Sequence, residues 1–359
     1  MAEARATVDA VERDLTAGRI PRARQRLTEA ARVLKKAACL SDASRAYRVL
    51  AELERRRGEM PSAVAAARLA LRVVRHEPES GSAEAALALL AQLHCDASDA
   101  GAALKHASQC LQQAEARGER AGIAAALQLQ AAAYLAARSY GLAVQHAAAA
   151  VAAEDGTQAE LCSRGRRLLA LALLQAGCPV AAVRELSPLL PRREATAADI
   201  PALTARGFAH LTVGNVAAGA RDLRKAARLT RQCEDRRREA QTLAAHALAE
   251  MMLARDTDRP KRAAAAERLA ARATRLAQRV RDPRTLSAVE WMVAAMHRNP
   301  SPFEGLPVRE TARGLVKQAH EAECLTLTGA CLAEVERLQQ FREEQLIRRC
   351  AFVPPLCLE

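Results

Sequence analysis

The stretch RRRGEMPSAVAAARLALRVV, residues 55–74, decides the fold, because its pattern returns along most of the chain. It reads as one turn at Gly58 followed by one helix. Within that helix Ala63, Ala67 and Ala70 stand five, nine and twelve residues after the glycine. Alanine is the strongest helix former and leaves room for a neighbouring helix to come close. The stretch therefore predicts a helix that packs tightly against the helix before the turn.

The same frame returns about every 40 residues. Its turn positions are Gly18, Gly58, Ser98, Arg138, Gly177 and Gly214. The position seven residues before the turn holds Ala51, Ala91, Ala131, Ala170 and Gly207. The position five residues after the turn holds Ala23, Ala63, Ala103, Ala143, Ala182 and Gly219. The position twelve residues after the turn holds Ala30, Ala70, Cys110, Ala150, Leu189 and Ala226. Small residues let two antiparallel helices approach, and glycine adopts the left-handed conformation that ends a helix. Repeated helix pairs of this kind stack into a solenoid.

This frame resembles the tetratricopeptide repeat (TPR) over roughly residues 2–235. The period is longer than the usual 34 residues, and Ala, Leu or His fills most of the family's aromatic positions. The position four before the turn, usually Tyr, reads Asp14, Glu54, His94, Tyr134, Leu173 and His210. The resemblance implies an all-α, right-handed α-solenoid of antiparallel helix pairs with a period of about 40. It also implies a concave face, lined by the first helix of each pair, that binds other proteins.

Composition agrees with an all-helical chain and bears on its partners. Half of the 359 residues are hydrophobic but only 2% are aromatic, so the core must consist mainly of Ala and Leu. The formal net charge of +13 favours acidic partners. The arginines are scattered, and we expect most on solvated helix faces, with an acidic protein surface as their alternative partner. Nucleic-acid binding is not expected, because the basic residues are neither clustered nor interleaved with aromatic residues.

The resemblance also indicates which residues line the concave face. Some TPR proteins hold acidic C-terminal peptides through a Lys five residues and an Asn nine residues into the first helix, and no repeat here carries that pair. The residues that the frame places on the inner face are Arg48, Glu52, Gln92, Gln128, Arg167 and Phe208. This mixed face suits a long protein segment or a helix better than a short charged tail.

After residue 235 the frame loosens. Helices are expected over residues 238–254 and 261–280, separated by the loop RDTDRP, and a further pair from Asp282 carries the only Trp, Trp291. The expected organisation has six TPR-like helix pairs in residues 1–235 and irregular TPR-like pairs in residues 236–297. A Pro-rich connector follows in residues 298–308, and C-terminal helices with a capping tail occupy residues 309–359.

Two families are similar to parts of the chain. Residues 165–297, with DRPKRA after the widened loop and the segment RDPRTLSAVEWMVAAMH, look like the C-terminal TPR region of anaphase-promoting complex subunit 5. This resemblance implies a scaffold in a ubiquitin ligase, without ligase chemistry of its own. The alternative is a free-standing bacterial regulatory or sensor protein, because the repeats also resemble the sensor half of MalT-like transcription regulators. No phosphate loop or helix-turn-helix signature is visible.

No constellation in the sequence indicates chemistry. None of the ten cysteines forms a CxxC pair, and His94, Cys95 and Cys110, like Cys324 and Cys331, are more typical of core positions than of a metal site. No nucleophile with a base and an orienting group is legible, so we expect neither enzymatic activity nor a cofactor. The charged N-terminus and the lack of a long apolar run predict no signal peptide and no membrane segment. Together these features favour a reducing compartment, the cytoplasm or the nucleus.

Charged residues at helical spacing are expected on solvated surfaces. Glu52 and Glu54 stand three or four residues from arginines, which is typical of ion pairs within one helix, and Glu250 is expected on a solvated surface with them. Arg68, Arg72 and Arg75 share the polar face of one helix. That pattern occurs in membrane-surface helices, but its place in a repeat favours an ordinary helix pair.

Overall fold

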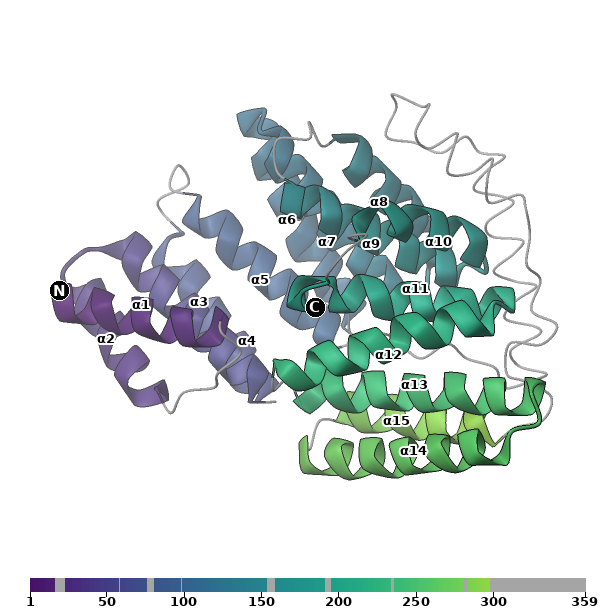
Figure 1. Ribbon diagram of the computed structural model, residues 1–359. Helices are drawn as coiled ribbons and strands as arrows, with labels where there is room; N and C mark the ends of the chain where they lie inside the picture. Colours follow the sequence, from purple (N-terminus) through teal and green to yellow (C-terminus); the bar gives the residue numbers. More distant parts are fainter. Residues whose placement is uncertain are drawn as a thin grey trace. The chain divides into compact units, whose positions relative to one another are not determined.

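The computed structural model describes residues 1–16, 23–57, 59–75, 81–97, 99–153, 159–190, 195–233, 236–280 and 283–297. Within these ranges the protein is built from helices, which confirms the expected all-α class (Figure 1). The N-terminal helices are α1 (Ala2–Thr16), α2 (Arg24–Lys36), α3 (Leu40–Arg56), α4 (Met60–Val73), α5 (Ser82–Asp96), α6 (Ala100–Arg117) and α7 (Arg120–Ala136). They are followed by α8 (Tyr140–Ala153), α9 (Ala159–Gln175), α10 (Pro179–Leu186), η2 (Ser187–Leu189), η3 (Ala197–Asp199), α11 (Ile200–Val213), α12 (Val216–Gln232), α13 (Arg236–Asp256), α14 (Pro260–Val280) and α15 (Pro283–Met296).

The chain forms two compact units, the first comprising residues 1–139 and 153–161. In this unit each helix from α1 to α7 packs against the next. The odd-numbered helices also contact one another, α1 with α3, α3 with α5 and α5 with α7. We call α1, α3, α5 and α7 the first-helix layer, because each was expected to be the first helix of a pair. Sequential pairing with one shared layer is the packing of a helical repeat array.

The second unit comprises residues 140–152 and 162–359. From α10 to α15 each helix again packs against the next, and α11 and α15 each also contact α13 (Figure 1). The contact between α12 and α13 spans residue 235, so helix packing continues where the sequence frame loosens. The domain boundaries expected from the sequence stay predictions, and those in residues 298–359 lie outside the described residues.

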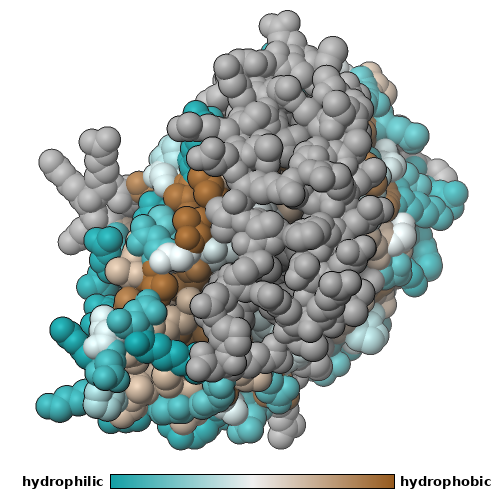
Figure 2. Space-filling model, turned by 90° about the vertical axis from the view of Figure 1, so that its right-hand side faces the viewer, coloured by the Kyte–Doolittle hydropathy of each residue, from teal (hydrophilic) through white to brown (hydrophobic). Residues whose placement is uncertain are grey.

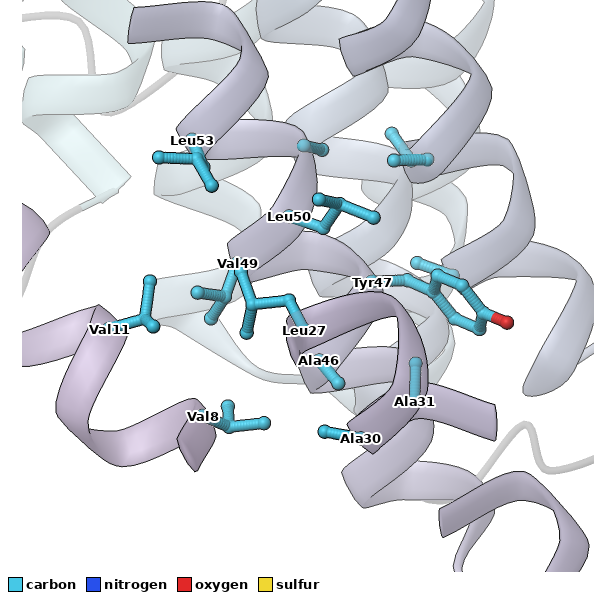
Figure 3. Packing of buried hydrophobic residues seen from close by; sticks show 14 of the residues in the cluster. Val8, Val11, Leu27, Ala30, Ala31, Ala46, Tyr47, Val49, Leu50 and Leu53 are labelled. Carbon is cyan, nitrogen blue, oxygen red and sulfur yellow. The ribbon is translucent and has the colours of Figure 1, made fainter. Parts of the chain in front are cut away.

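The core consists mainly of Ala and Leu, as the composition predicts. In the first unit Val8, Leu27, Ala46 and Leu50 from α1, α2 and α3 belong to one buried cluster (Figure 3). The small residues of the repeat frame lie inside, and the exposed fraction is 0% for the following alanines: Ala51, Ala63, Ala91, Ala103, Ala131, Ala143, Ala170 and Ala182. A side chain of one methyl group at each of these points allows the backbones of packed helices to come close.

Helices α11 and α12 approach each other very closely. A Cβ atom added to Gly207 would lie 2.6 Å from Cγ of Leu223. A Cβ atom added to Gly219 would lie 2.9 Å from the backbone oxygen of Gly207 and 2.8 Å from Cδ2 of Leu211. Real Cβ atoms do not come within 3.0 Å of other heavy atoms, so a side chain at either position would force its neighbours to move. These are the frame positions seven before and five after Gly214, where the sequence predicted close approach.

Several neighbouring helices in the described part of the chain are joined by tight turns of one type. At Gly214 the N–H of Asn215 donates to the carbonyl oxygen of His210 (2.9 Å), and the N–H of Gly214 donates to that of Leu211 (3.1 Å). This pair of bonds is the Schellman motif, which satisfies the last carbonyls of a helix and needs a left-handed residue. Gly214 has φ +90°, and Asn215 then caps α12 by accepting a hydrogen bond from the N–H of Ala218.

Left-handed residues also occur at junctions that the frame did not mark. The expected turn positions Arg138, Gly177 and Gly214 all have positive φ, whereas Gly18, Gly58 and Ser98 lie outside the described residues. Positive φ also occurs between pairs at Ala38 and Gly118, and at Asp258 between α13 and α14, each with the two bonds of the same motif. One turn geometry therefore serves both within and between helix pairs.

Hydrophilic residues make up much of the described surface on the face in Figure 2, with hydrophobic residues in a smaller area. Among the described residues the exposed large hydrophobic side chains are Met1, Leu69, Val180 and Val213. The hydrophobic residues are thus mostly inside the helix stack.

We predict that Gly219→Ala destabilises the protein. The added methyl group would overlap the Gly207 carbonyl oxygen, and relief requires α11 and α12 to move apart, at a cost of about 1–3 kcal/mol. Urea denaturation followed by circular dichroism measures this. Gly101→Ala is the control, because a Cβ there has its nearest neighbour at 3.9 Å. That variant should be as stable as the parent or more so, and equal losses in both variants would contradict the close-approach argument.

We predict that Ala38→Gly stabilises the protein. Ala38 is exposed and has φ +58°, a conformation that costs an L-residue roughly 1–2 kcal/mol, whereas glycine adds about 0.4–1 kcal/mol of unfolded-state entropy. The net gain should be about 0.5–1 kcal/mol. The neighbouring exposed Ala37, with φ −83°, provides the control, since Ala37→Gly can only destabilise. Thermal unfolding of the two variants side by side should show shifts of opposite sign.

Candidate interaction surface

The first-helix layer carries most of the residues expected to contact a partner. Arg48 and Glu52 lie on α3, Gln92 on α5 and Gln128 on α7. Because α3 contacts α5 and α5 contacts α7, these residues belong to one continuous layer of the first unit. Arg167 on α9 and Phe208 on α11 belong to the second unit.

Charged residues of α1 and α3 form ion pairs at one end of this layer. The Arg45 guanidinium pairs with Asp9 (2.9 Å) and with Glu12, and Arg5 pairs with Asp42 (2.6 Å). These side chains are a third to a half exposed, so the ion pairs fix the positions of the charged groups on the surface but contribute little to the free energy of unfolding.

Arg48 lies beside these pairs and is half-buried. Burial lowers its pKa, the positive charge of Arg45 acts in the same direction, and Glu12 opposes them. In the described part of the chain the buried Nε of Arg48 has no hydrogen-bond partner. An incompletely paired guanidinium in this layer can accept a carboxylate from a partner.

Glu52 is the centre of a second ionic network. Nε of Arg55 donates to Oε2 of Glu52 (2.8 Å), and Nε of Arg56 donates to Oε1 (2.7 Å). Arg55 also reaches Asp96 on α5 (3.1 Å), so the network joins two neighbouring helices of the layer. Burial raises the pKa of Glu52, but hydrogen bonds and positive charge from Arg55 and Arg56 outweigh it, and the net pKa is lowered.

The remaining predicted residues differ in whether they are available to a partner. Gln92 and Arg167 are half-buried. Gln128 is buried, and its Nε2 donates to the carbonyl oxygen of Leu161 (3.0 Å), so it holds structure together. Phe208 is fully buried. The expectation that Phe208 lines a binding surface is corrected by this burial, because helical spacing indicates a direction but not the depth of the layers above it.

Glu250 forms a buried ionic cluster that sequence spacing assigned to a solvated surface. It is 7% exposed and pairs with Arg224 on α12, His246 on α13 (3.2 Å) and Arg262 on α14 (3.5 Å). Burial raises its pKa, and the hydrogen bond from Arg224 and the charges of His246 and Arg224 outweigh that effect, so the net pKa is lowered. The expected solvated position of Glu250 was wrong, because its side chain is buried and two of its three partners come from neighbouring helices.

Glu54 is likewise buried, at 1% exposed, with Nε of Arg24 on α2 at 3.4 Å. Glu250 on α13 and Glu54 on α3 therefore link neighbouring helices through ion pairs and do not lie on a solvated surface. Two of these pairs have a local spacing that the sequence shows: His246 with Glu250, and Glu54 with Arg57, whose Nη1 lies 4.0 Å from Oε1 of Glu54.

The cysteines of the described part are free thiols. Cys110 is buried, and burial raises its pKa to about 12, which confirms its expected core position. Within the described ranges no three His, Cys, Asp or Glu side chains converge as metal ligands do. Cys324 and Cys331 lie outside those ranges.

No protein-family model matches the sequence, and no curated protein matches it either. In the part of the chain that the structure describes, no helix combines the length and apolar character needed to cross a membrane. The function of the protein is therefore inferred from the surfaces of the molecule itself.

We predict that Glu52→Gln destabilises the protein by about 1 kcal/mol at pH 7, because its hydrogen bonds to two guanidinium groups weaken in a partly exposed site. The folded pKa of Glu52 is below its unfolded value of about 4.3, so its stabilisation is present above that value and disappears as pH falls through the folded pKa.

The difference between the parent and the variant should accordingly shrink as pH falls below about 4.3 and vanish once pH is below the folded pKa. Denaturation midpoints measured from pH 7 to pH 3 test this expectation. Glu29→Gln, which alters an exposed pair with Arg32, is the matched control and should leave the midpoint unchanged. A pH-independent loss in Glu52→Gln would contradict the role given to its charge.

Proposed function

We propose that the protein is a non-enzymatic scaffold for protein–protein interaction, built as a right-handed α-solenoid of TPR-like helix pairs with a period of about 40 residues. Its partner is a protein segment or helix that lies across the first-helix layer. The observation that carries the proposal is the contact of α1, α3, α5 and α7 with one another, which makes one extended layer out of separate pairs.

The positions at which the helices begin support the proposed period of about 40 residues. The first helices begin at Ala2, Leu40, Ser82, Arg120, Ala159 and Ile200, and the second helices begin at Arg24, Met60, Ala100, Tyr140, Pro179 and Val216. Repeat arrays of this kind present extended surfaces, which suit long protein segments better than small substrates.

The side chains of the layer support recognition of a protein rather than of a small molecule. Arg48, Glu52 and Gln92 are half-buried polar side chains on neighbouring helices of the layer. Protein interfaces use a few fixed polar and charged groups of this kind.

The resemblances leave two narrower proposals. The first is a subunit 5-like TPR scaffold of the anaphase-promoting complex. The second is a free-standing bacterial TPR regulatory or sensor protein, similar to the sensor half of MalT-like regulators. They differ in the partners they require, namely cullin and RING subunits in the first case and a regulator or NTPase in the second.

Site-specific photo-crosslinking tests the proposal. p-Benzoylphenylalanine replaces Arg48 or Gln92 in the full chain, and the control replaces Arg26, which is exposed on α2. After irradiation in cells of the source organism, mass spectrometry identifies the adducts. We expect one protein to be recovered from both layer positions and not from the control, and its identity separates the two narrower proposals.

The proposal would be contradicted by the absence of adducts at both layer positions, or by the same set of proteins at all three positions. Circular dichroism of each purified variant verifies that the helices are retained.

A further inference from the structure

A second surface, outside the first-helix layer, carries unbalanced positive charge. Helix α4 contains no acidic residue, and its exposed face carries Arg68, Arg72 and, just past its end, Arg75. Intervals of four and three residues place these arginines in one row along the helix. Among the described residues none of the three has an ion-pair partner. In the described part of the chain these guanidinium groups are therefore exposed to solvent without an acidic partner.

Helix α6 extends this charge. Lys105 is exposed, and His106 beside it is half-buried. Burial lowers the pKa of His106, its hydrogen bond with Gln109 opposes that effect, and the charges of His94, Lys105 and Arg68 lower the pKa further. Helices α4 and α6 both pack on α5, and the charge of Arg68 on α4 acts on His106 of α6, so the cations of the two helices belong to one surface. We call Arg68, Arg72, Arg75, Lys105 and His106 the cation surface.

A buried histidine stands behind the cation surface. The rings of His94 on α5 and His106 stack, with their centroids 5.6 Å apart. Nδ1 of His94 pairs with Asp99 (3.2 Å), whose other oxygen caps α6 by accepting the N–H of Ala102 (3.1 Å). His94 is 7% exposed, and its buried Nε2 has no hydrogen-bond partner in the described part of the chain.

We propose that the cation surface on α4 and α6 binds an acidic segment of a partner protein, one with several closely spaced Asp or Glu side chains. This goes beyond the proposed function, because it assigns a binding role to the second helices and a definite chemistry to what they bind. Carboxylates pair with guanidinium groups through two parallel hydrogen bonds, which favours a row of arginines over lysines at this site.

A protein segment fits this surface better than a nucleic acid does. The row from Arg68 to Arg75 covers about 10 Å of helix, the reach of a few neighbouring carboxylates. Nucleic-acid binders neutralise about 6–10 phosphates or stack bases on aromatic rings, whereas α4 and α6 contain no aromatic residue apart from the ring of His106. Leu69, which is 38% exposed, offers an apolar contact to a side chain of the segment.

Binding of an acidic segment should also change the protonation of His106. The groups that act on it are His94 from α5, Arg68 from α4, and Lys105 and Gln109 from α6 itself. On α7, which also packs on α6, Gln130 hydrogen-bonds to Ser108 and brings no charge. Carboxylates placed on the surface would cancel the repulsion from Arg68 and Lys105 and raise the pKa of His106. Binding should therefore take up a proton and tighten as pH falls from 8 to 6.

Fluorescence anisotropy of the full chain with a labelled deca-glutamate peptide tests the proposal. Arg68→Ala/Arg72→Ala should weaken binding roughly tenfold or more, from the loss of two charge-assisted contacts. The control Arg221→Ala/Arg228→Ala removes the same charge from exposed positions of α12 and should change the affinity less than about twofold. His106→Gln should keep the affinity at pH 8 and lose the tightening at pH 6.

Equal losses in both double variants would overturn the proposal, because binding would then reflect net charge alone. Tighter binding of a ten-nucleotide RNA than of the peptide, lost in Arg68→Ala/Arg72→Ala, would assign the surface to nucleic acid and overturn it as well. Both results leave crosslinks from Arg48 and Gln92 unaffected, so the two proposals fail separately.

Discussion

The close approach of neighbouring helices is the constraint on which the rest of the structure depends. With so few aromatic residues, the core cannot gain burial from large rings, and it reaches interior density only if small side chains let backbones come together. The buried alanines of the repeat frame provide this throughout, and at Gly207 and Gly219 even a methyl group is too large. Because each pair is tight, the charged side chains lie at its edges, where they form the surfaces that can meet a partner.

The turns follow from the same constraint. Helices that pack closely must reverse within very few residues, and the Schellman motif does so with one left-handed residue that ends one helix and one residue that begins the next. The frame identified Arg138, Gly177 and Gly214 as such points, and all three are left-handed. It missed Ala38, because alanine gives no signal of a left-handed conformation and only the positions of the flanking helices impose it.

The sequence predicted faces more reliably than depth. Helical spacing placed Arg48, Glu52 and Gln92 in one layer, and the structure brings their helices together. The same spacing could not show that Phe208 and Gln128 are buried, since this depends on what packs above them. Nor could it find the partners of Glu250, because Arg224 and Arg262 approach it from separate helices. Pairing across helices is a property of the tertiary structure, and a single sequence carries no local signal for it.

Hydrogen–deuterium exchange of the full chain, alone and with its crosslinked partner added back, tests most directly the claim that the first-helix layer is a protein-binding surface. A segment lying across this layer should slow amide exchange in α3 and α5, while exchange in α2 stays as it is in the free chain. Unchanged exchange in α3 and α5 with a bound partner, or protection confined to α12 and α14, would contradict that claim.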